Sequence, residues 1–113
     1  MPNTGCFLFF LEMVYNVYMI DNIDVKKIHK EVEAGKAFLL DVRSKEEFAE
    51  FSIPNSINLS VEDIQFGKVP DLPRDSKIYA FCMTGARSEK AVSLLKLMDF
   101  TNVVNAGGII SLV

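Results

Sequence analysis

One short segment combines a reactive side chain with a backbone arrangement that could activate it. It consists of Cys82, Met83, Thr84, Gly85, Ala86, Arg87 and Ser88, between an apolar run and the most regular helical pattern of the chain. A loop that turns from a strand end into a helix directs several N–H groups at one point. Those groups and the helix dipole would stabilise a thiolate. The sequence therefore predicts that Cys82 is a nucleophile at neutral pH and is open to solvent, with N–H groups that could also hold an oxyanion or a persulfide.

The rest of the chain alternates predicted strands with predicted helices. Strands are expected at 37–42, 56–59, 77–81 and 101–105, and helices after Asp24, after Ser44, after Ser60 and over 88–98. Ser44 and Glu47 have the spacing of a capping box, which predicts where the second helix begins. This alternation is typical of an α/β fold with a parallel sheet and helices on both faces. Ligands of such sheets bind at the carboxyl ends of the strands, where Asp41 to Arg43, Phe81 to Arg87 and Ala106 to Gly108 are expected.

Composition narrows the class of protein. The chain has 113 residues, which suits one domain, and its net charge of −3 argues against nucleic acid as the main partner. The two cysteines, Cys6 and Cys82, form no C-x-x-C pair and are too few for a disulfide scaffold. We therefore expect no metal ion and no cofactor, and a reducing compartment, the cytoplasm.

The N-terminal segment has a different character from the rest. Residues 6–20 are almost continuously apolar, but Glu12 and Asn16 interrupt the run, and a bilayer span needs roughly 20 apolar residues. No basic residue precedes Lys26, which argues against a signal peptide. We expect residues 1–19 to form an apolar extension that is buried or that mediates homo-oligomer contacts, with residues 20–113 as the folded domain. Translation from Met13 or Met19 is an alternative, and a membrane anchor is the least favoured one.

Three motifs in the expected order carry a resemblance to a known family. FCMTGARS resembles the active-site loop of single-domain rhodaneses, which commonly reads C-R-S-G-x-R-S. LLDVRSKEEFAEFSIPNSINL resembles the first family signature, with matches at Asp41, Val42, Arg43, Glu47, Phe48, Ile53, Pro54 and Asn58. Gly107 and Gly108 match the glycine pair before the last family helix. The chain is thus identified as a member of the rhodanese-like family over 20–113, which implies a three-layer α/β sandwich with a mostly parallel sheet and an apparently truncated last helix.

The resemblance implies a mechanism as well as a fold. The Cys82 thiolate would attack the outer sulfur of thiosulfate or a persulfide donor, and the resulting Cys82 persulfide would pass its sulfur to a thiol, cyanide or protein acceptor. The N–H groups of the loop would stabilise the anionic states, with help from the Thr84 hydroxyl. Met83 replaces the usual basic residue, which weakens the case for thiosulfate, a dianion.

The neighbouring charged residues are expected to brace the site. We predict that Asp41 and Arg43 hydrogen-bond the loop and pair with Glu47. Arg87 is expected either to brace the loop, through a surface salt bridge or a pairing with Asp41, or to contact an anion. His29 lies on an amphipathic helix and is expected to face solvent.

Two other classes of function remain open. Cysteine phosphatases and arsenate reductases also place a thiolate beside an oxyanion, but their loops read C-x5-R, whereas four residues separate Cys82 from Arg87 here. The shorter loop suits one sulfur atom better than a phosphate, and no general acid for a leaving group is evident. The other alternative is a non-catalytic sulfur-carrier or regulatory binding module, against which the intact Cys82 argues.

Overall fold

The computed structural model describes residues 24–113. These residues form the helices α2 (Val25–Glu33), α3 (Lys45–Glu50), α4 (Val61–Gln65), α5 (Ala86–Leu97) and α6 (Ile109–Leu112), and the strands β1 (Phe38–Asp41), β2 (Ser56–Asn58), β3 (Ile78–Cys82) and β4 (Val103–Gly108). None of the described helices is long and apolar enough to cross a membrane. The predictions for residues 1–19 lie outside the described residues.

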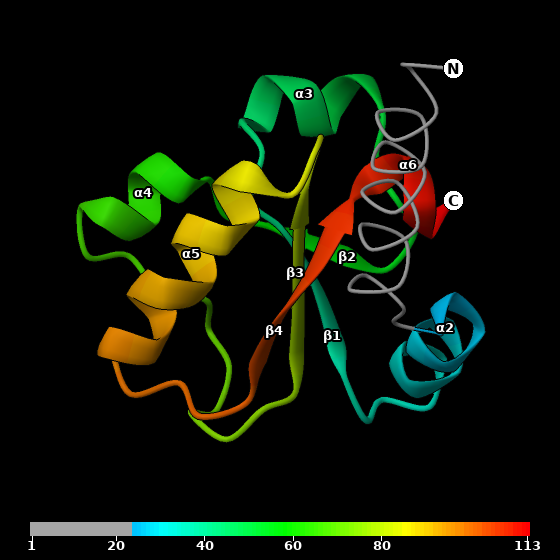
Figure 1. The fold of residues 1–113 in the computed structure, drawn as a ribbon, viewed down its shortest axis with the longest axis horizontal. Coiled ribbons are helices and arrows are strands. Elements are labelled where there is room, and N and C mark those ends of the chain that lie inside the picture. The colour runs from blue at the N-terminus through cyan, green and yellow to red at the C-terminus, as the bar shows by residue number, and fades with distance from the viewer. Residues whose placement is uncertain (1–23) are drawn as a thin grey trace, which may run out of the picture.

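The four strands form one parallel sheet in the order β2-β1-β3-β4 (Figure 1). Leu40 of β1 lies opposite Ile57 of β2 on one side and Ala80 of β3 on the other. Helices α4 and α5 pack on one face of the sheet, and α2 and α6 pack on the other. The predicted α/β fold with helices on both faces is therefore confirmed.

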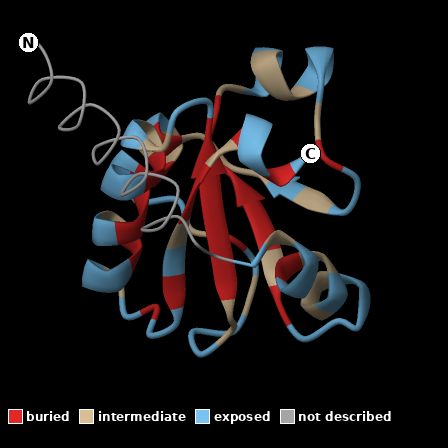
Figure 2. Ribbon diagram, turned by 45° about the vertical axis from the view of Figure 1, so that its right-hand side comes forward, coloured by how far each residue is buried: buried red, intermediate tan, exposed pale blue. Residues whose placement is uncertain are grey.

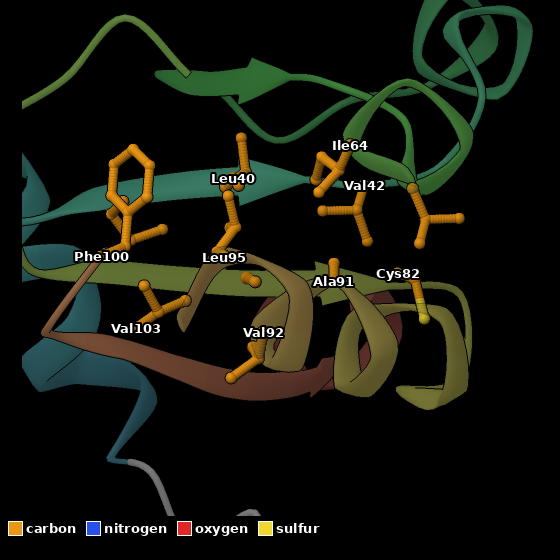
Figure 3. Packing of buried hydrophobic residues seen from close by; sticks show 12 residues of the cluster. Leu40, Val42, Ile64, Cys82, Ala91, Val92, Leu95, Phe100 and Val103 are labelled. Atoms are coloured by element: carbon orange, nitrogen blue, oxygen red, sulfur yellow. The ribbon is translucent and has the colours of Figure 1, made fainter. Parts of the chain in front are cut away.

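Alternation along the strands divides the core into two layers. In β3, Ile78, Ala80 and Cys82 belong to the cluster under α4 and α5, whereas Tyr79 and Phe81 belong to the cluster under α2 and α6. Every residue of β3 is buried, as expected for a central strand with helices on both faces. Figure 2 shows the buried residues concentrated along the central strands, and Figure 3 shows Cys82 at one end of the first cluster.

The helix starts follow the predicted capping residues in three cases. Asp24, Ser44 and Ser60 each accept a backbone N–H with their side chains, and Ser44 and Glu47 form a complete capping box. Helix α5 starts without a side-chain cap after Gly85, earlier than the predicted residue 88. Because α5 begins at Ala86, its N-terminus lies directly against Cys82.

The prediction for His29 is wrong. Its ring is half-buried, and Nε2 lies 2.8 Å from the carbonyl oxygen of Leu112, to which it donates. Helix α2 packs beside α6 on the same face of the sheet, so the histidine faces another helix instead of solvent. The contact ties α2 to the helix that follows the glycine pair.

Candidate active site

Cys82 is the last residue of β3, and the chain turns at Gly85 into α5. Gly85 has a φ of +101°, in the left-handed region that a side chain rarely adopts. A Cβ at this position would lie 3.3 Å from the Cα of Gly107. Conformation and close packing together therefore require glycine here, and the tight turn folds the start of α5 back onto the cysteine sulfur.

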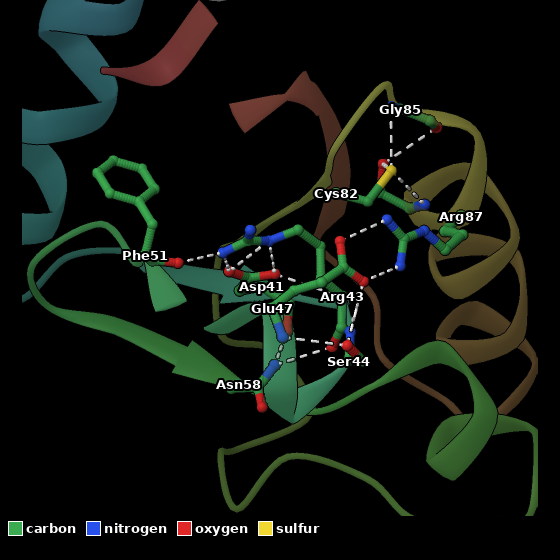
Figure 4. A network of polar contacts seen from close by, with 10 residues as sticks. Asp41, Arg43, Ser44, Glu47, Phe51, Asn58, Cys82, Gly85 and Arg87 are labelled. Atoms are coloured by element: carbon green, nitrogen blue, oxygen red, sulfur yellow. Dashed lines mark hydrogen bonds and ion pairs between the residues drawn. The ribbon is translucent and has the colours of Figure 1, made fainter. Parts of the chain in front are cut away.

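Two backbone N–H groups and one hydroxyl of this turn lie around Sγ of Cys82 (Figure 4). The backbone nitrogen of Gly85 lies 3.0 Å from the sulfur and that of Ser88 lies 3.4 Å from it. The Ser88 hydroxyl oxygen is 3.5 Å away. Burial raises the pKa of the Cys82 thiol, but hydrogen bonds from Ser88, Gly85 and Thr84 together hold that pKa below its ordinary value. The predicted arrangement of N–H groups around an activated thiol is present.

The expectation that this sulfur is open to solvent is wrong. Cys82 is 0% exposed and belongs to the hydrophobic cluster that contains Val42 and Ala91. The reason is the extent of β3, which includes Cys82, so the alternation of the strand turns its side chain toward α5. The loop covers the sulfur, and the side chains of Met83, Thr84 and Ala86 lie on its exposed outer side.

Arg87 is bound to a carboxylate of α3. Its two terminal nitrogens lie 2.6 and 3.0 Å from the two carboxylate oxygens of Glu47. The hydrogen bonds from Arg87 are the largest cause that lowers the pKa of Glu47 to about 2. The pairing of Arg87 with Asp41 is therefore wrong, but the other expected arrangement, a partly exposed salt bridge that braces the active-site loop, is present against α3.

Asp41 and Arg43 form a second, buried ion pair. Nη2 of Arg43 lies 2.6 Å from Oδ2 of Asp41, and the two side chains are 3% and 0% exposed. Arg43 also donates to the carbonyl of Phe51 at 2.7 Å. The prediction that this arginine pairs with Glu47 is wrong, because Asp41 and Arg43 lie two residues apart at the end of β1 and bond each other. Arg43 braces the loop after β1 through Phe51, whereas none of the hydrogen bonds described for these two side chains reaches the active-site loop.

Two asparagines have roles that the sequence analysis did not assign. Asn58 matches the first family signature, and its Nδ2 donates to the carbonyls of Asp41 and Arg43, each at 3.0 Å. Asn105 lies in the middle of β4 and bonds Gly85 and Ser88, which flank the first turn of α5. Asn105 is the last residue of the strand predicted at 101–105, and parallel sheets place their sites at the carboxyl ends of strands. That position could have identified it as a site residue.

Comparisons with known proteins agree with this geometry. The family described as "Rhodanese-like domain" matches residues 24–110, so the chain belongs to the rhodanese-like domain family. It is 33% identical over 98 residues to the adenylyltransferase and sulfurtransferase uba4 of Ogataea parapolymorpha, a match that covers 86% of the chain and 24% of that protein. A sulfurtransferase of Allochromatium vinosum is 28% identical over 95 residues, covering 82% of the chain and 88% of that protein.

Solved structures give the same assignment. The human single-domain sulfurtransferase TSTD1 superposes with a TM-score of 0.66 at 25% identity, covering 74% of this chain and 85% of that one. A rhodanese-related protein of Thermoplasma volcanium has a TM-score of 0.65 at 32% identity, covering 78% and 85%. The chain spans about a quarter of the length of the first two curated relatives it matches. The names of the shorter relatives support rhodanese-type sulfur transfer, the activity that the sequence predicts.

Proposed function

We propose that this domain transfers sulfane sulfur through a persulfide on Cys82. The observation that carries the proposal is the set of N–H groups from Gly85 and Ser88 that converge on the sulfur at the start of α5. The Cys82 thiolate attacks the outer sulfur of a donor, a new S–S bond forms, and the donor's own S–S bond breaks with its electron pair on the leaving group. An acceptor thiolate then attacks the outer sulfur of the Cys82 persulfide, which restores the Cys82 thiolate.

We further propose that the donor is a persulfide in preference to thiosulfate. Glu47 holds the guanidinium of Arg87, and Met83 occupies the position beside the cysteine. A protonated persulfide is neutral at its reacting sulfurs and its leaving thiolate carries one negative charge, which the neutral N–H groups can stabilise. Thiosulfate carries two charges, and the second finds the nearby arginine already paired.

Access of the donor requires a movement of the loop. Because Cys82 is 0% exposed, a donor sulfur reaches it when residues 83–86 move outward. The side chains of Met83, Thr84 and Ala86 face solvent, so this movement breaks the contacts of the Gly85 backbone with Cys82 and Asn105 and buries no new side chain. We infer that loop opening precedes attack by the thiolate.

Intact-mass spectrometry tests the proposal directly. After incubation with glutathione persulfide and removal of small molecules, we expect the protein to gain the mass of one sulfur atom. The gain should persist in Cys6→Ser and vanish in Cys82→Ser, which separates the two cysteines. Thiosulfate should give a smaller gain at equal concentration. A wild-type mass that never changes, or a Cys6→Ser protein that gains no sulfur, rules out a Cys82 persulfide and leaves a non-catalytic binding module.

The setting of the reaction is also a proposal. A free, activated thiolate needs reducing surroundings, so we place the protein in the cytoplasm, with a small thiol or a protein as the acceptor. We propose that residues 1–19 are an apolar extension through which the chain self-associates. Size-exclusion chromatography of a variant without residues 1–18 tests this, because an unchanged oligomeric state together with unchanged thermal stability would contradict it.

A further inference from the structure

The Ser88 hydroxyl has one proton and three acceptors within reach. Its oxygen lies 2.7 Å from Oδ1 of Asn105, 3.0 Å from the carbonyl oxygen of Gly85 and 3.5 Å from Sγ of Cys82. A serine hydroxyl donates one hydrogen bond. The acceptor that takes this proton therefore decides whether the sulfur receives a side-chain donor.

Main-chain groups fix the orientation of the Asn105 side chain. The N–H of Gly107, which can only donate, lies 2.9 Å from Oδ1, and the carbonyl of Gly85, which can only accept, lies 3.1 Å from Nδ2. The atom that faces Ser88 is therefore the amide oxygen, which is an acceptor. Its distance to the Ser88 oxygen is typical of an O–H···O hydrogen bond, and two acceptors so close would repel each other. The hydroxyl of Ser88 consequently donates to Asn105.

We propose that Asn105 is a positioning residue for Cys82: it takes the hydroxyl proton of Ser88 and leaves the sulfur with the N–H donors of the turn. The inference rests on the proposed role of Cys82 as the nucleophile. A hydroxyl that donated to the thiolate would stabilise it further, and a more stabilised thiolate is a weaker nucleophile. By keeping that donor away, Asn105 keeps the thiolate reactive.

A double-mutant cycle tests where the proton lies. All proteins carry Cys6→Ser, and the pKa of Cys82 is measured from thiolate absorbance. The effect of Ser88→Ala on that pKa is compared between proteins with Asn105 and proteins with Asn105→Ala. We expect Ser88→Ala to change the pKa little when Asn105 is present. Without Asn105 the freed hydroxyl turns to the charged sulfur, in preference to the Gly85 carbonyl that already accepts the N–H of Glu89 at 3.0 Å. Ser88→Ala should then raise the pKa by about one unit.

Matched variants separate this role from a structural one. Any loosening of the loop by Asn105→Ala is present in both members of that pair, so it cancels in the comparison. Asn105→Leu also lacks an acceptor but fills the space, and serves if the alanine variant does not fold. Asn105→Asp keeps an acceptor oxygen, so the effect of Ser88→Ala should stay small. Asn102→Ala, an exposed site just before β4, is the control and should leave the small effect unchanged.

Two results would overturn the inference. One is an equal rise in the Cys82 pKa on Ser88→Ala in every background, because the Ser88 hydroxyl would then donate to the sulfur even when Asn105 is present. The other is no effect of Ser88→Ala in the Asn105→Ala and Asn105→Leu backgrounds, because the hydroxyl would then never reach it. The titration uses no sulfur donor and therefore does not depend on the proposed function. A protein that takes up no sulfur would disprove that function, while the pKa comparison would still test the role of Asn105.

Discussion

Gly108 sets the position of the active-site loop, and Gly108→Ala should displace that loop. The residue lies opposite Cys82 where β3 and β4 pair. A Cβ there would lie 2.6 Å from the carbonyl oxygen of Met83 and 3.5 Å from Cα of Thr84, where ordinary contact begins at 3.4 Å. The backbone of Gly108, with φ −95° and ψ 149°, suits any residue, so the contact alone produces the effect. The clash is with backbone, which cannot rotate away, so we expect a loss near the upper end of the usual cost of overpacking, about 3 kcal/mol.

The same substitution at Gly67 provides a matched control. Gly67 has a φ of +96° with nothing within 4 Å of the added Cβ, so alanine there should cost about 1–2 kcal/mol through backbone strain alone. Urea unfolding measures both losses. A displaced loop lengthens the hydrogen bond from the Gly85 N–H to the sulfur, so the Cys82 pKa should rise in Gly108→Ala and stay unchanged in Gly67→Ala. Equal stabilities and an unaltered Cys82 pKa in both variants would show that Gly108 does not hold the loop.

Three further predictions concern the ion pairs and the core. Arg43→Met should lower the free energy of unfolding by about 3–5 kcal/mol in urea titrations, because it leaves the Asp41 carboxylate buried and unpaired. Glu47→Gln should cost about 1 kcal/mol at neutral pH, since the ion pair is partly exposed. The folded protein holds the pKa of Glu47 at about 2, below the pKa of this carboxyl in the unfolded chain. The ionised carboxylate therefore stabilises the fold fully above the unfolded-chain pKa, and this contribution is lost as the pH falls through about 2. The difference in unfolding free energy between Glu47→Gln and the wild type should accordingly shrink in acid. Phe100→Ala should cost about 3–5 kcal/mol because the ring is buried, whereas Phe66→Ala, at an 87% exposed site, should cost almost nothing in the same thermal unfolding experiment.

The parts of the structure that could be predicted depend on contacts close in the chain. The capping box of Ser44 and Glu47 spans three residues, and the apolar runs of β1 and β3 reflect burial on both faces of a parallel sheet. The turn that directs N–H groups at Cys82 also follows from a short segment, because a strand, a glycine and a helix start occur within a few residues. Local pattern therefore sufficed for the sheet and for the donors around the sulfur.

The partners of the charged side chains could not be predicted in the same way. Arg87 and Glu47 lie 40 positions apart, and their contact depends on how α3 is placed over the end of the sheet. Arg87 was the arginine expected to pair with Asp41, but the Asp41 carboxylate bonds Arg43, two residues further along the chain. The burial of Cys82 could have been found from the alternation of β3, had the strand been extended by one residue beyond Phe81.

Charge balance at the site links these findings. The carboxylates of Asp41 and Glu47 neutralise the arginines beside the loop, so a negative sulfur is stabilised by neutral dipoles in a buried position. Fixed dipoles act strongly where water is excluded, so the N–H groups stabilise the sulfur anion most when the loop is closed over it. Exchange between the Cys82 thiolate and a protonated persulfide keeps a single negative charge throughout, so the same N–H donors stabilise the thiolate before and after transfer. In the proposed reaction, the Glu47 carboxylate is therefore the group that limits the site to one charge, because it occupies the guanidinium that a second charge would require.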